Sequence, residues 1–374
     1  MAEDLKSNYP FNGYDKFNLV KNIAYIEIDT HSEVARDFID VMQDSDKFKV
    51  DYYFSKRIND ETGHSAENVF LSDSSMIIDQ LKSKPYDLVI LGTVHRYFDT
   101  FSIIAESYNS AIIVHNINFT NISGLRLFKS IFKADVVYRL KLWWKEGLFY
   151  SSKVYQKAKN LLVLDEELSS DRLSFLPLFY TKNVSKSYNN QTLVVVIPGG
   201  VSQKRRDYQK VFATIKKLED LYNTGVQNKP IEFVFLGKAK NAELDQITNL
   251  QRSLQYIKIT YFAERVSQED FDHWMQKADV LWCPIQEETE FFSLKEVYGK
   301  TKMTGNLGDA IKYGKPAVFP KNYQSHLDFI VPERQDIIRQ FEELKNKSFS
   351  FQKEYPKKGV KEQLETVLRR LIST

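Results

Sequence analysis

Ten short runs of almost uninterrupted apolar residues recur along this chain of 374 residues, and a stretch with helical spacing follows each of them. The runs are Ile23–Ile28, Val50–Phe54, Leu88–Leu91, Ala111–Val114, Leu161–Leu164, Leu193–Ile197, Ile231–Leu236, Ile257–Phe262, Val280–Pro284 and Ala317–Phe319. Such runs are typical of strands buried on both faces, because helices cover a parallel sheet above and below. The alternation of strand and helix therefore predicts a doubly wound α/β fold.

The segment Tyr180–Gln191 separates two sets of five runs; it is polar, lacks periodicity and contains Asn-Asn, as is typical of an interdomain linker. We therefore expect two Rossmann-like parallel-sheet domains, residues 1–180 and 192–350, joined by residues 181–191. They would face each other across a cleft at the carboxyl ends of their strands. Residues 351–374 predict a closing helix that either packs locally or crosses back to the first domain.

Composition narrows the class of protein. Net charge is only +3, with 52 Lys and Arg against 49 Asp and Glu, which argues against a nucleic-acid binder. The single cysteine, Cys283, excludes an internal disulfide and a cysteine-based zinc cluster, and no His/Asp cluster at ligand spacing calls for a metal. The polar start of the chain lacks a signal-peptide pattern, and no uncharged apolar run approaches about 18 residues. We expect a cytoplasmic protein, either free or held at the inner face of a membrane.

The first candidate site is the stretch 193–208, LVVVIPGGVSQKRRDY, in which a buried strand runs into a Gly-Gly turn and then a basic run. Glycines let the backbone approach a ligand, a helix N-terminus offers N–H groups to an anion, and Arg matches phosphate oxygens. Lys204, Arg205 and Arg206 before a helix at Asp207–Leu221 are therefore a candidate diphosphate site. A tight turn with a solvated basic run explains the residues equally well.

The second candidate site is the stretch 298–318, where Thr304-Gly305 precedes a short helix expected at Leu307–Tyr313. Another small-residue turn feeds a helix N-terminus here, with Lys302 as a nearby positive charge. Asp309, expected in the first helical turn, could accept hydrogen bonds from a ribose diol. The competing interpretation is a charge-capped helix with a glycine stop, which is common.

Together these stretches resemble the C-terminal domain of retaining GT-B glycosyltransferases, the group that includes glycogen synthase-like and mannosyltransferase-like enzymes. The resemblance covers about residues 193–320 and rests on the order of elements, including 261–285 (YFAERVSQEDFDHWMQKADVLWCPI) and Gly308–Val318. Asp309 stands in place of the second glutamate of that group's Glu-x7-Glu pair, and Thr301 stands where the other acid would be.

The resemblance implies roles for several residues. Lys204 and Arg205 (or Arg206) match the basic pair that neutralises the donor diphosphate, and Thr304-Gly305 fall where backbone N–H groups meet phosphate and sugar. Arg265-Val266 fall where the nucleobase is held, and Asp309 where the ribose is held. The implied substrate is a UDP- or GDP-linked sugar, used without a cofactor or a tightly held metal.

The first half of the chain resembles the group less closely. The run Ala111–Phe119 (AIIVHNINF) looks like the group's strand that ends in a histidine, so His115 is the candidate contact to the donor sugar. His31, in the loop after Ile23–Ile28, is a second candidate, and either could act as general base if the enzyme inverts. The sequence favours structural or surface roles for His95, His273 and His326.

Residues 126–159 form a basic and aromatic segment, with nine Lys or Arg residues against Asp135 and Glu146 and with Trp143, Trp144 and Phe149 interleaved. This composition suits an interface with anionic lipid. It equally suits a pair of helices with apolar faces in the core and charges in water.

The sequence thus predicts a glycosyltransferase that moves a sugar from a nucleotide diphosphate to an acceptor hydroxyl on a surface polysaccharide or a lipid-linked glycan. Two alternatives remain open. A sugar-nucleotide epimerase uses the same fold, but it needs several acidic and histidine residues around the sugar, which the sequence does not bring together. A non-catalytic homologue that binds or activates another subunit would explain Thr301 in place of an acid.

Overall fold

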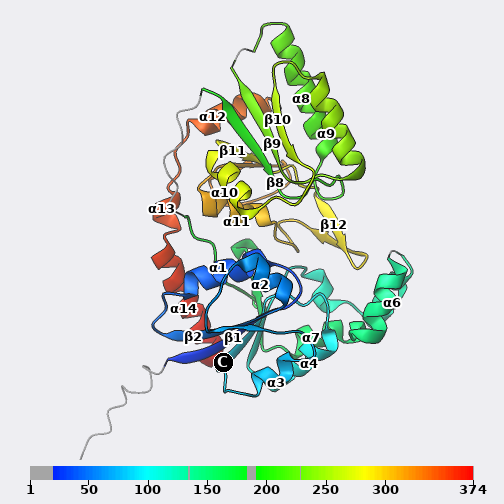
Figure 1. The fold of residues 1–374 in the computed structure, drawn as a ribbon, viewed down its shortest axis with the longest axis vertical. Helices are drawn as coiled ribbons and strands as arrows, with labels where there is room; N and C mark the ends of the chain where they lie inside the picture. The colour runs from blue at the N-terminus through cyan, green and yellow to red at the C-terminus, as the bar shows by residue number, and fades with distance from the viewer. Residues whose placement is uncertain (1–19, 134, 183–190, 228, 374) are drawn as a thin grey trace, which may run out of the picture.

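The computed structural model describes residues 20–133, 135–182, 191–227 and 229–373, so residues 183–190 of the expected linker lie outside the described residues. Two separate parallel sheets form the core of the chain (Figure 1). All ten predicted runs are strands of these sheets. The prediction of two doubly wound α/β units is confirmed.

The first sheet has the strand order β3-β2-β1-β4-β5-β6-β7, and every neighbouring pair is parallel. Its strands are β1 (Lys21–Glu27), β2 (Phe48–Phe54), β3 (Val69–Leu71), β4 (Leu88–Leu91), β5 (Ser110–Ile113), β6 (Asn160–Val163) and β7 (Leu173–Phe175). One face packs on α1 (Ser32–Met42) and α2 (Lys56–Thr62), the other on α3 (Ile77–Leu81), α4 (Phe98–Ser107) and α7 (Ser151–Lys157). Alternate residues of β1, such as Ala24 and Tyr25, enter opposite cores, which explains the unbroken apolar run.

The second sheet has the order β10-β9-β8-β11-β14-β15 and is also parallel. Its strands are β8 (Leu193–Pro198), β9 (Ile231–Lys238), β10 (Lys258–Phe262), β11 (Val280–Trp282), β14 (Ala317–Phe319) and β15 (Ile330–Pro332). The helices α8 (Tyr208–Asn223), α9 (Asn241–Ser253) and α12 (Ile337–Lys345) cover one face. The opposite face packs on α10 (Gln268–Lys277), α11 (Gly305–Tyr313) and α13 (Phe351–Glu354).

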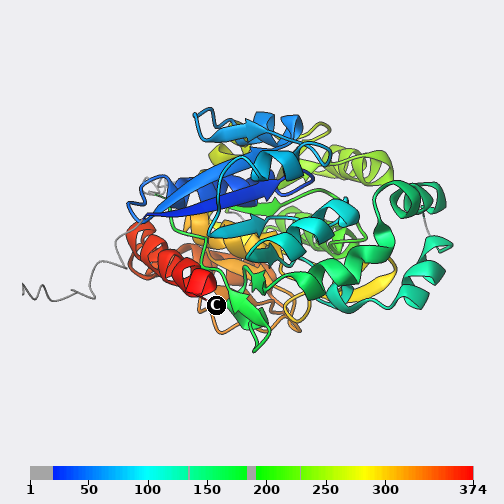
Figure 2. The same cartoon turned by 90° about the horizontal axis from the view of Figure 1, so that it is seen from below.

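The last helix, α14 (Lys357–Ser373), returns to the first sheet (Figures 1 and 2). Val360, Leu364, Leu368 and Leu371 are buried in the same core cluster as residues of α1 and β1. Glu365 accepts hydrogen bonds from Ser45 Oγ (2.8 Å) and Lys47 Nζ (2.6 Å). The carboxyl end of the chain therefore crosses back and closes the core of the first domain.

A hairpin that the sequence did not predict joins the two domains. Strands β12 (Glu288–Phe291) and β13 (Leu294–Val297) are antiparallel, and Phe291, Phe292 and Leu294 pack in the core of the first domain. Glu296 is buried and accepts hydrogen bonds from the backbone N–H groups of Asn118 (3.4 Å) and Phe119 (3.2 Å). The second domain therefore contacts the core of the first domain through the β12–β13 hairpin.

Candidate active site

Three histidines meet at the carboxyl ends of three adjacent strands. His31 follows β1, His95 follows β4 and His115 follows β5. The ring of His31 stacks on that of His115 with centroids 3.9 Å apart, and the ring of His95 lies 6.0 Å and 5.8 Å from these two. The structure thus brings together the two predicted catalytic histidines and adds His95, for which the sequence favoured a structural or surface role.

His31 is paired with a carboxylate. It precedes α1 with a left-handed backbone (φ 63°), and its Nδ1 lies 2.8 Å from Oε1 of Glu33. Partial burial alone would lower the pKa of His31, but the hydrogen bond and charge of Glu33 outweigh burial and raise it above its usual value. The Glu33 side chain is 58% exposed, and the hydrogen bond and charge of His31 lower the pKa of its carboxyl to about 2. The pair leaves Nε2 of His31 as a base with a fixed orientation.

The other two imidazoles are neutral. His115 Nε2 lies 2.9 Å from the carbonyl oxygen of Gly92, and His95 Nε2 lies 3.1 Å from Nδ2 of Asn116. Loss of water, followed by repulsion from His31, holds the pKa values of both histidines well below the usual range. Neither has a carboxylate partner of the kind that His31 has among the described contacts.

A buried carboxyl, that of Glu27, lies at the end of β1 and is close enough to His31 to feel its charge. Glu27 Oε1 accepts hydrogen bonds from the amides of Asp29 and Thr30, both at 3.0 Å, and Oε2 accepts one from Thr93 Oγ1 at 2.6 Å. Burial raises the pKa of Glu27 to about 7 despite these bonds. A Cβ at Gly92 would lie 2.7 Å from Oε2, so only glycine leaves room for the carboxyl there.

In the second domain, the Gly-Gly turn after β8 packs closely against β9 and against Arg206. Gly199 has φ 99°, and a Cβ at Gly237 would lie 2.4 Å from its backbone. Arg206 lies over the turn and donates to the Gly200 carbonyl (3.3 Å) and to Oδ1 of Asn306 (3.1 Å). Arg206 is thus held within the protein rather than free in solvent.

Asn306 ties the two predicted turns together. Its Nδ2 donates to the carbonyl of Pro198 (3.2 Å), and its backbone N–H donates to Oγ1 of Thr304, the residue that caps α11 (3.4 Å). Gly305 is exposed at the first helical position, where an amide has no partner within the helix. The two turns therefore converge at the N-terminus of α11.

Two expectations about these helices need correction. α8 begins at Tyr208, and its first amides are used within the chain: Lys210 N–H binds Asp207 (3.2 Å) and Gln209 N–H binds Gln203 (3.1 Å). The N-terminus of α8 is therefore not an open anion site. α11 begins at Gly305 because Thr304 caps it, so Asp309 lies in the second turn and not the first.

Asp309 belongs to a group of charges between the domains. Lys312 Nζ lies 3.9 Å from Asp309 and 3.1 Å from Asp37 of α1. Burial raises the pKa of the Asp309 carboxyl above its usual value. Its proposed contact to a ribose would have to compete with this ion cluster.

Lys302 belongs to the second domain, and its positive charge lies close to the histidines of the first. Its Nζ donates to Oδ1 of Asn116, the residue after His115. Burial lowers the pKa of Lys302 to about 8. Its charge adds to the fall in the pKa of His95 and His115 and partly opposes the rise in the pKa of His31. The positive charge of Arg205 adds to the fall in the pKa of Lys302.

The remaining predicted residues lie further out. Lys204 and Arg205 are exposed, and no carboxylate is paired with either side chain in the described part of the chain. Arg265 is 74% exposed and pairs with Glu61 of α2 (2.6 Å), so it links the two domains. Val266 is half-buried against the core of the second domain. The roles of Arg265 and Val266 in nucleobase binding stay predictions.

Side chains that the sequence did not single out complete this site. Each of these residues carries only a weak local signal. Glu27 is a lone acid in an apolar run, whereas Glu33, Asn116 and Asn306 are polar neighbours of a chosen His or Gly. Among the described residues, no group of three or more His, Cys, Asp or Glu is placed to hold a metal ion.

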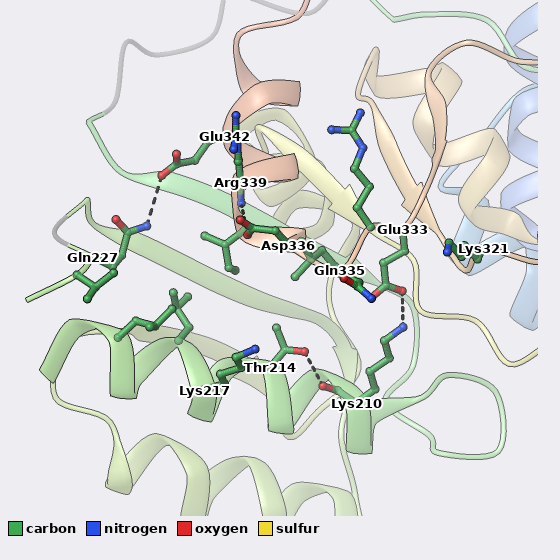
Figure 3. Close-up of a pocket in the computed structure, with 16 residues that line it drawn as sticks. Lys210, Thr214, Lys217, Gln227, Lys321, Glu333, Gln335, Asp336, Arg339 and Glu342 are labelled. Carbon is green, nitrogen blue, oxygen red and sulfur yellow. Dashed lines mark hydrogen bonds and ion pairs between the residues drawn. The ribbon is translucent and has the colours of Figure 1, made fainter. Parts of the chain in front are cut away.

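A large pocket of about 1010 Å³ lies away from this site, between α8 and α12 (Figure 3). Lys210, Thr214, Glu333 and Asp336 line it, and Lys210 is bonded to Glu333 (2.7 Å). None of the predicted site residues lines it. We therefore take the histidine cluster, and not this pocket, as the candidate active site.

The two parallel sheets, with the site residues at their facing carboxyl ends, define a GT-B-like fold. No protein-family model matches the chain, and no curated protein matches its sequence. Among solved structures, Anabaena Alr3699/HepE in complex with UDP is similar at a TM-score of 0.58 and 12% identity, over 94% of this chain and 100% of that one. The UDP-GlcNAc 2-epimerase of Neisseria meningitidis bound to UDP-GlcNAc is similar at 0.52 and 11%, over 94% and 100%.

The N-terminal domain of Candida albicans trehalose-6-phosphate phosphatase is similar at a TM-score of 0.53 and 9% identity, over 96% of this chain and 95% of that one. At such identities the likenesses establish the fold alone. The three structures share the two-domain α/β fold of this chain, and their printed names differ in activity, so the fold does not by itself assign one.

Proposed function

We propose that this chain is a glycosyltransferase that moves a sugar from a UDP- or GDP-linked donor to an acceptor hydroxyl on a surface polysaccharide or lipid-linked glycan. One observation carries the proposal: the cationic turns of the second domain, joined through Asn306, face the histidines of the first through Lys302. Two structural neighbours were solved with UDP and with UDP-GlcNAc, which supports a nucleotide ligand, and the general place of ligands on such sheets supports this edge.

In the proposed reaction, Nε2 of His31 takes the proton of the acceptor hydroxyl while Glu33 holds the ring and stabilises the imidazolium. The acceptor oxygen bonds to the sugar carbon, the bond from that carbon to the diphosphate oxygen breaks, and its electron pair leaves with the diphosphate. Arg205, Lys302 and the amide of Gly305 would stabilise the developing negative charge. Arg206 would position the turns, because its Nη1 and Nη2 donate to Gly200 and Asn306 within the protein.

This mechanism inverts the sugar configuration, whereas the sequence resembles retaining enzymes. The His31–Glu33 pair favours inversion because direct displacement by a hydroxyl needs a base. The anomeric configuration of the product, read by NMR, separates the two. Retention would remove His31 from the role of base and leave the donor assignment standing.

The test is a panel of nucleotide sugars incubated with the full chain and glycan acceptors, followed by nucleotide release. Arg205→Ala is expected to lower the rate by about 100-fold or more, as the loss of a charge-stabilising donor does. Arg252→Ala, an exposed arginine at the end of α9, is the matched control and should leave the rate unchanged. A full rate for Arg205→Ala with a verified donor would refute the diphosphate assignment.

The second candidate is a sugar-nucleotide epimerase, and one observation favours it. The structure brings Glu27, Glu33 and three histidines to one sheet edge, which is the acid-and-histidine surrounding that the sequence did not assemble. An epimerase would alter the sugar without an acceptor and without net nucleotide release. A non-catalytic subunit would bind nucleotide, seen as a rise in melting temperature, and do neither.

A further inference from the structure

The helices α5 (Gly124–Ile131) and α6 (Val136–Lys145), here called the projecting pair, stand out from the body of the first domain (Figures 1 and 2). A 3-10 turn at Leu148–Tyr150 follows them. Nine of the large hydrophobic side chains that are exposed in the described structure lie on these elements or, for Phe132, directly after α5: Leu125, Phe128, Phe132, Val136, Val137, Tyr138, Trp144, Phe149 and Tyr150. A concentration of exposed apolar side chains of this kind marks an interaction site.

The exposed apolar residues follow helical spacing on the outer side of each helix. Leu125, Phe128 and Phe132 recur at i, i+3 and i+7 and are 68%, 46% and 61% exposed. On α6, Val137 and Trp144 share a face and are 85% and 81% exposed. The inner sides are used for packing, since Leu127 and Leu142 are buried in the core of the first domain and Ile131 is buried as well. Each helix thus has a second apolar face that the described chain does not cover.

Exposed cations lie on the same segment as these apolar residues. Arg126, Lys129, Lys133, Lys141 and Lys145 are exposed, and within the described residues of 124–145 the opposing exposed charge is Asp135 alone. Glu146 is buried and bonded to Arg96 (2.8 Å), so it does not neutralise the outer face. The surface combines Trp and Tyr with Lys and Arg, which is the pattern of elements that lie in the headgroup region of a bilayer.

We propose that the projecting pair docks on an anionic lipid bilayer. A protein partner fits less well, because lysine is depleted at the cores of protein interfaces and here lysines alternate with the apolar residues. The surface also projects rather than forming a groove. None of the described helices is long and apolar enough to cross a bilayer, so the contact would be interfacial.

The inner side of the pair fixes it next to the histidines. Arg96 follows His95 and binds Glu146 at the end of α6, and the amide of Phe98 donates to the Glu146 carbonyl (2.8 Å). Arg139 of α6 donates to Oγ of Ser293 in the interdomain hairpin (2.9 Å). A docked bilayer would therefore lie beside the candidate active site, within reach of a lipid-linked acceptor.

The experiment is co-sedimentation of the full chain with vesicles of phosphatidylglycerol and phosphatidylcholine, compared with phosphatidylcholine alone, in the absence of any nucleotide sugar. Binding to the anionic vesicles is expected, with release by salt. Trp144→Glu should lower binding by about tenfold or more, whereas Val226→Glu, a 73% exposed residue of the second domain, should not change it. An unchanged unfolding midpoint for Trp144→Glu would show that the fold is kept.

The charge contribution has its own variant. Lys141→Glu with Lys145→Glu should weaken binding to anionic vesicles by more than tenfold, since each cation near the surface contributes about fivefold. Lys216→Glu with Lys217→Glu on α8 is the matched control. Absence of binding at low salt, or an equal loss of binding in the control, would overturn the proposal. So would a fall in oligomer mass in Trp144→Glu, because it would mean that a second copy of the chain covers this surface. Because the assay contains no donor, its outcome is independent of the proposed enzyme activity.

Discussion

The buried carboxyl of Glu27 gives the most direct test of how the site is built. Burial raises its pKa from 4.5 to about 7, and at about 1.4 kcal/mol per pKa unit the difference corresponds to about 3 kcal/mol. The folded state binds the proton more tightly than the unfolded state does. Stability therefore falls as pH rises from about 4.5 to about 7, and the full penalty persists above that range.

Glu27→Gln should remove this penalty. Oε1 of the amide can still accept from Asp29 and Thr30, and Nε2 can donate to the hydroxyl of Thr93, which is free to rotate. We expect the variant to be up to about 3 kcal/mol more stable than the natural chain at pH 8, with about 2.5 kcal/mol of that difference developing between pH 5 and pH 8.

The assay is urea unfolding of both proteins at pH 5, 6, 7 and 8, with comparison of the transition that contains the first domain. Glu67→Gln, an exposed acid between α2 and β3, is the control and should run parallel to the natural chain at every pH. Parallel curves for Glu27→Gln as well would refute the reasoning, because they would mean that Glu27 titrates alike in the folded and unfolded states.

Three further predictions follow from other contacts. Glu33→Gln should lower the pKa of His31 and move the acidic limb of kcat/KM to lower pH; an unmoved limb would exclude His31 as the base. The donor KM should rise as pH passes about 8, where Lys302 loses its charge, and Lys302→Arg should move that rise to higher pH. Leu364→Ala should destabilise the first domain by about 2–5 kcal/mol in urea unfolding, whereas the exposed Glu362→Ala should leave its stability unchanged. A loss below about 1 kcal/mol for Leu364→Ala would contradict the packing of α14 in the core of the first domain.

Three strands that the sequence did not predict were missed for the same physical reason. β3, β7 and β15 have three residues each and lie at or near sheet edges, where one side lacks the burial that produces long apolar runs. The hairpin β12–β13 turns through Phe292 and Ser293 at φ 48° and 60°, positions that hairpin turns usually give to Gly or Asn. Their backbone is held by packing of Phe292 in the first domain, which no local pattern shows.

The candidate site divides in the same way. The Gly199 turn, the cap at Thr304 and the histidines at strand ends follow local rules, so the sequence could select them. The bonds of Asn306 to Arg206 and Pro198, which join turns about 100 residues apart, depend on the order of the strands. The same holds for the three histidines, which meet because β1, β4 and β5 are neighbours in the sheet.

The sequence by itself determined that this chain forms two parallel sheets covered by helices, because burial on both faces imposes an apolar run on each central strand. It also determined where each strand ends and which glycines, histidines and cations follow. Only the tertiary structure decided which of these ends meet, that Asn306 joins the two turns, and that His95 and His115 lose their charge. Those outcomes depend on distances across the fold and on the exclusion of water, which exist only once the chain is packed.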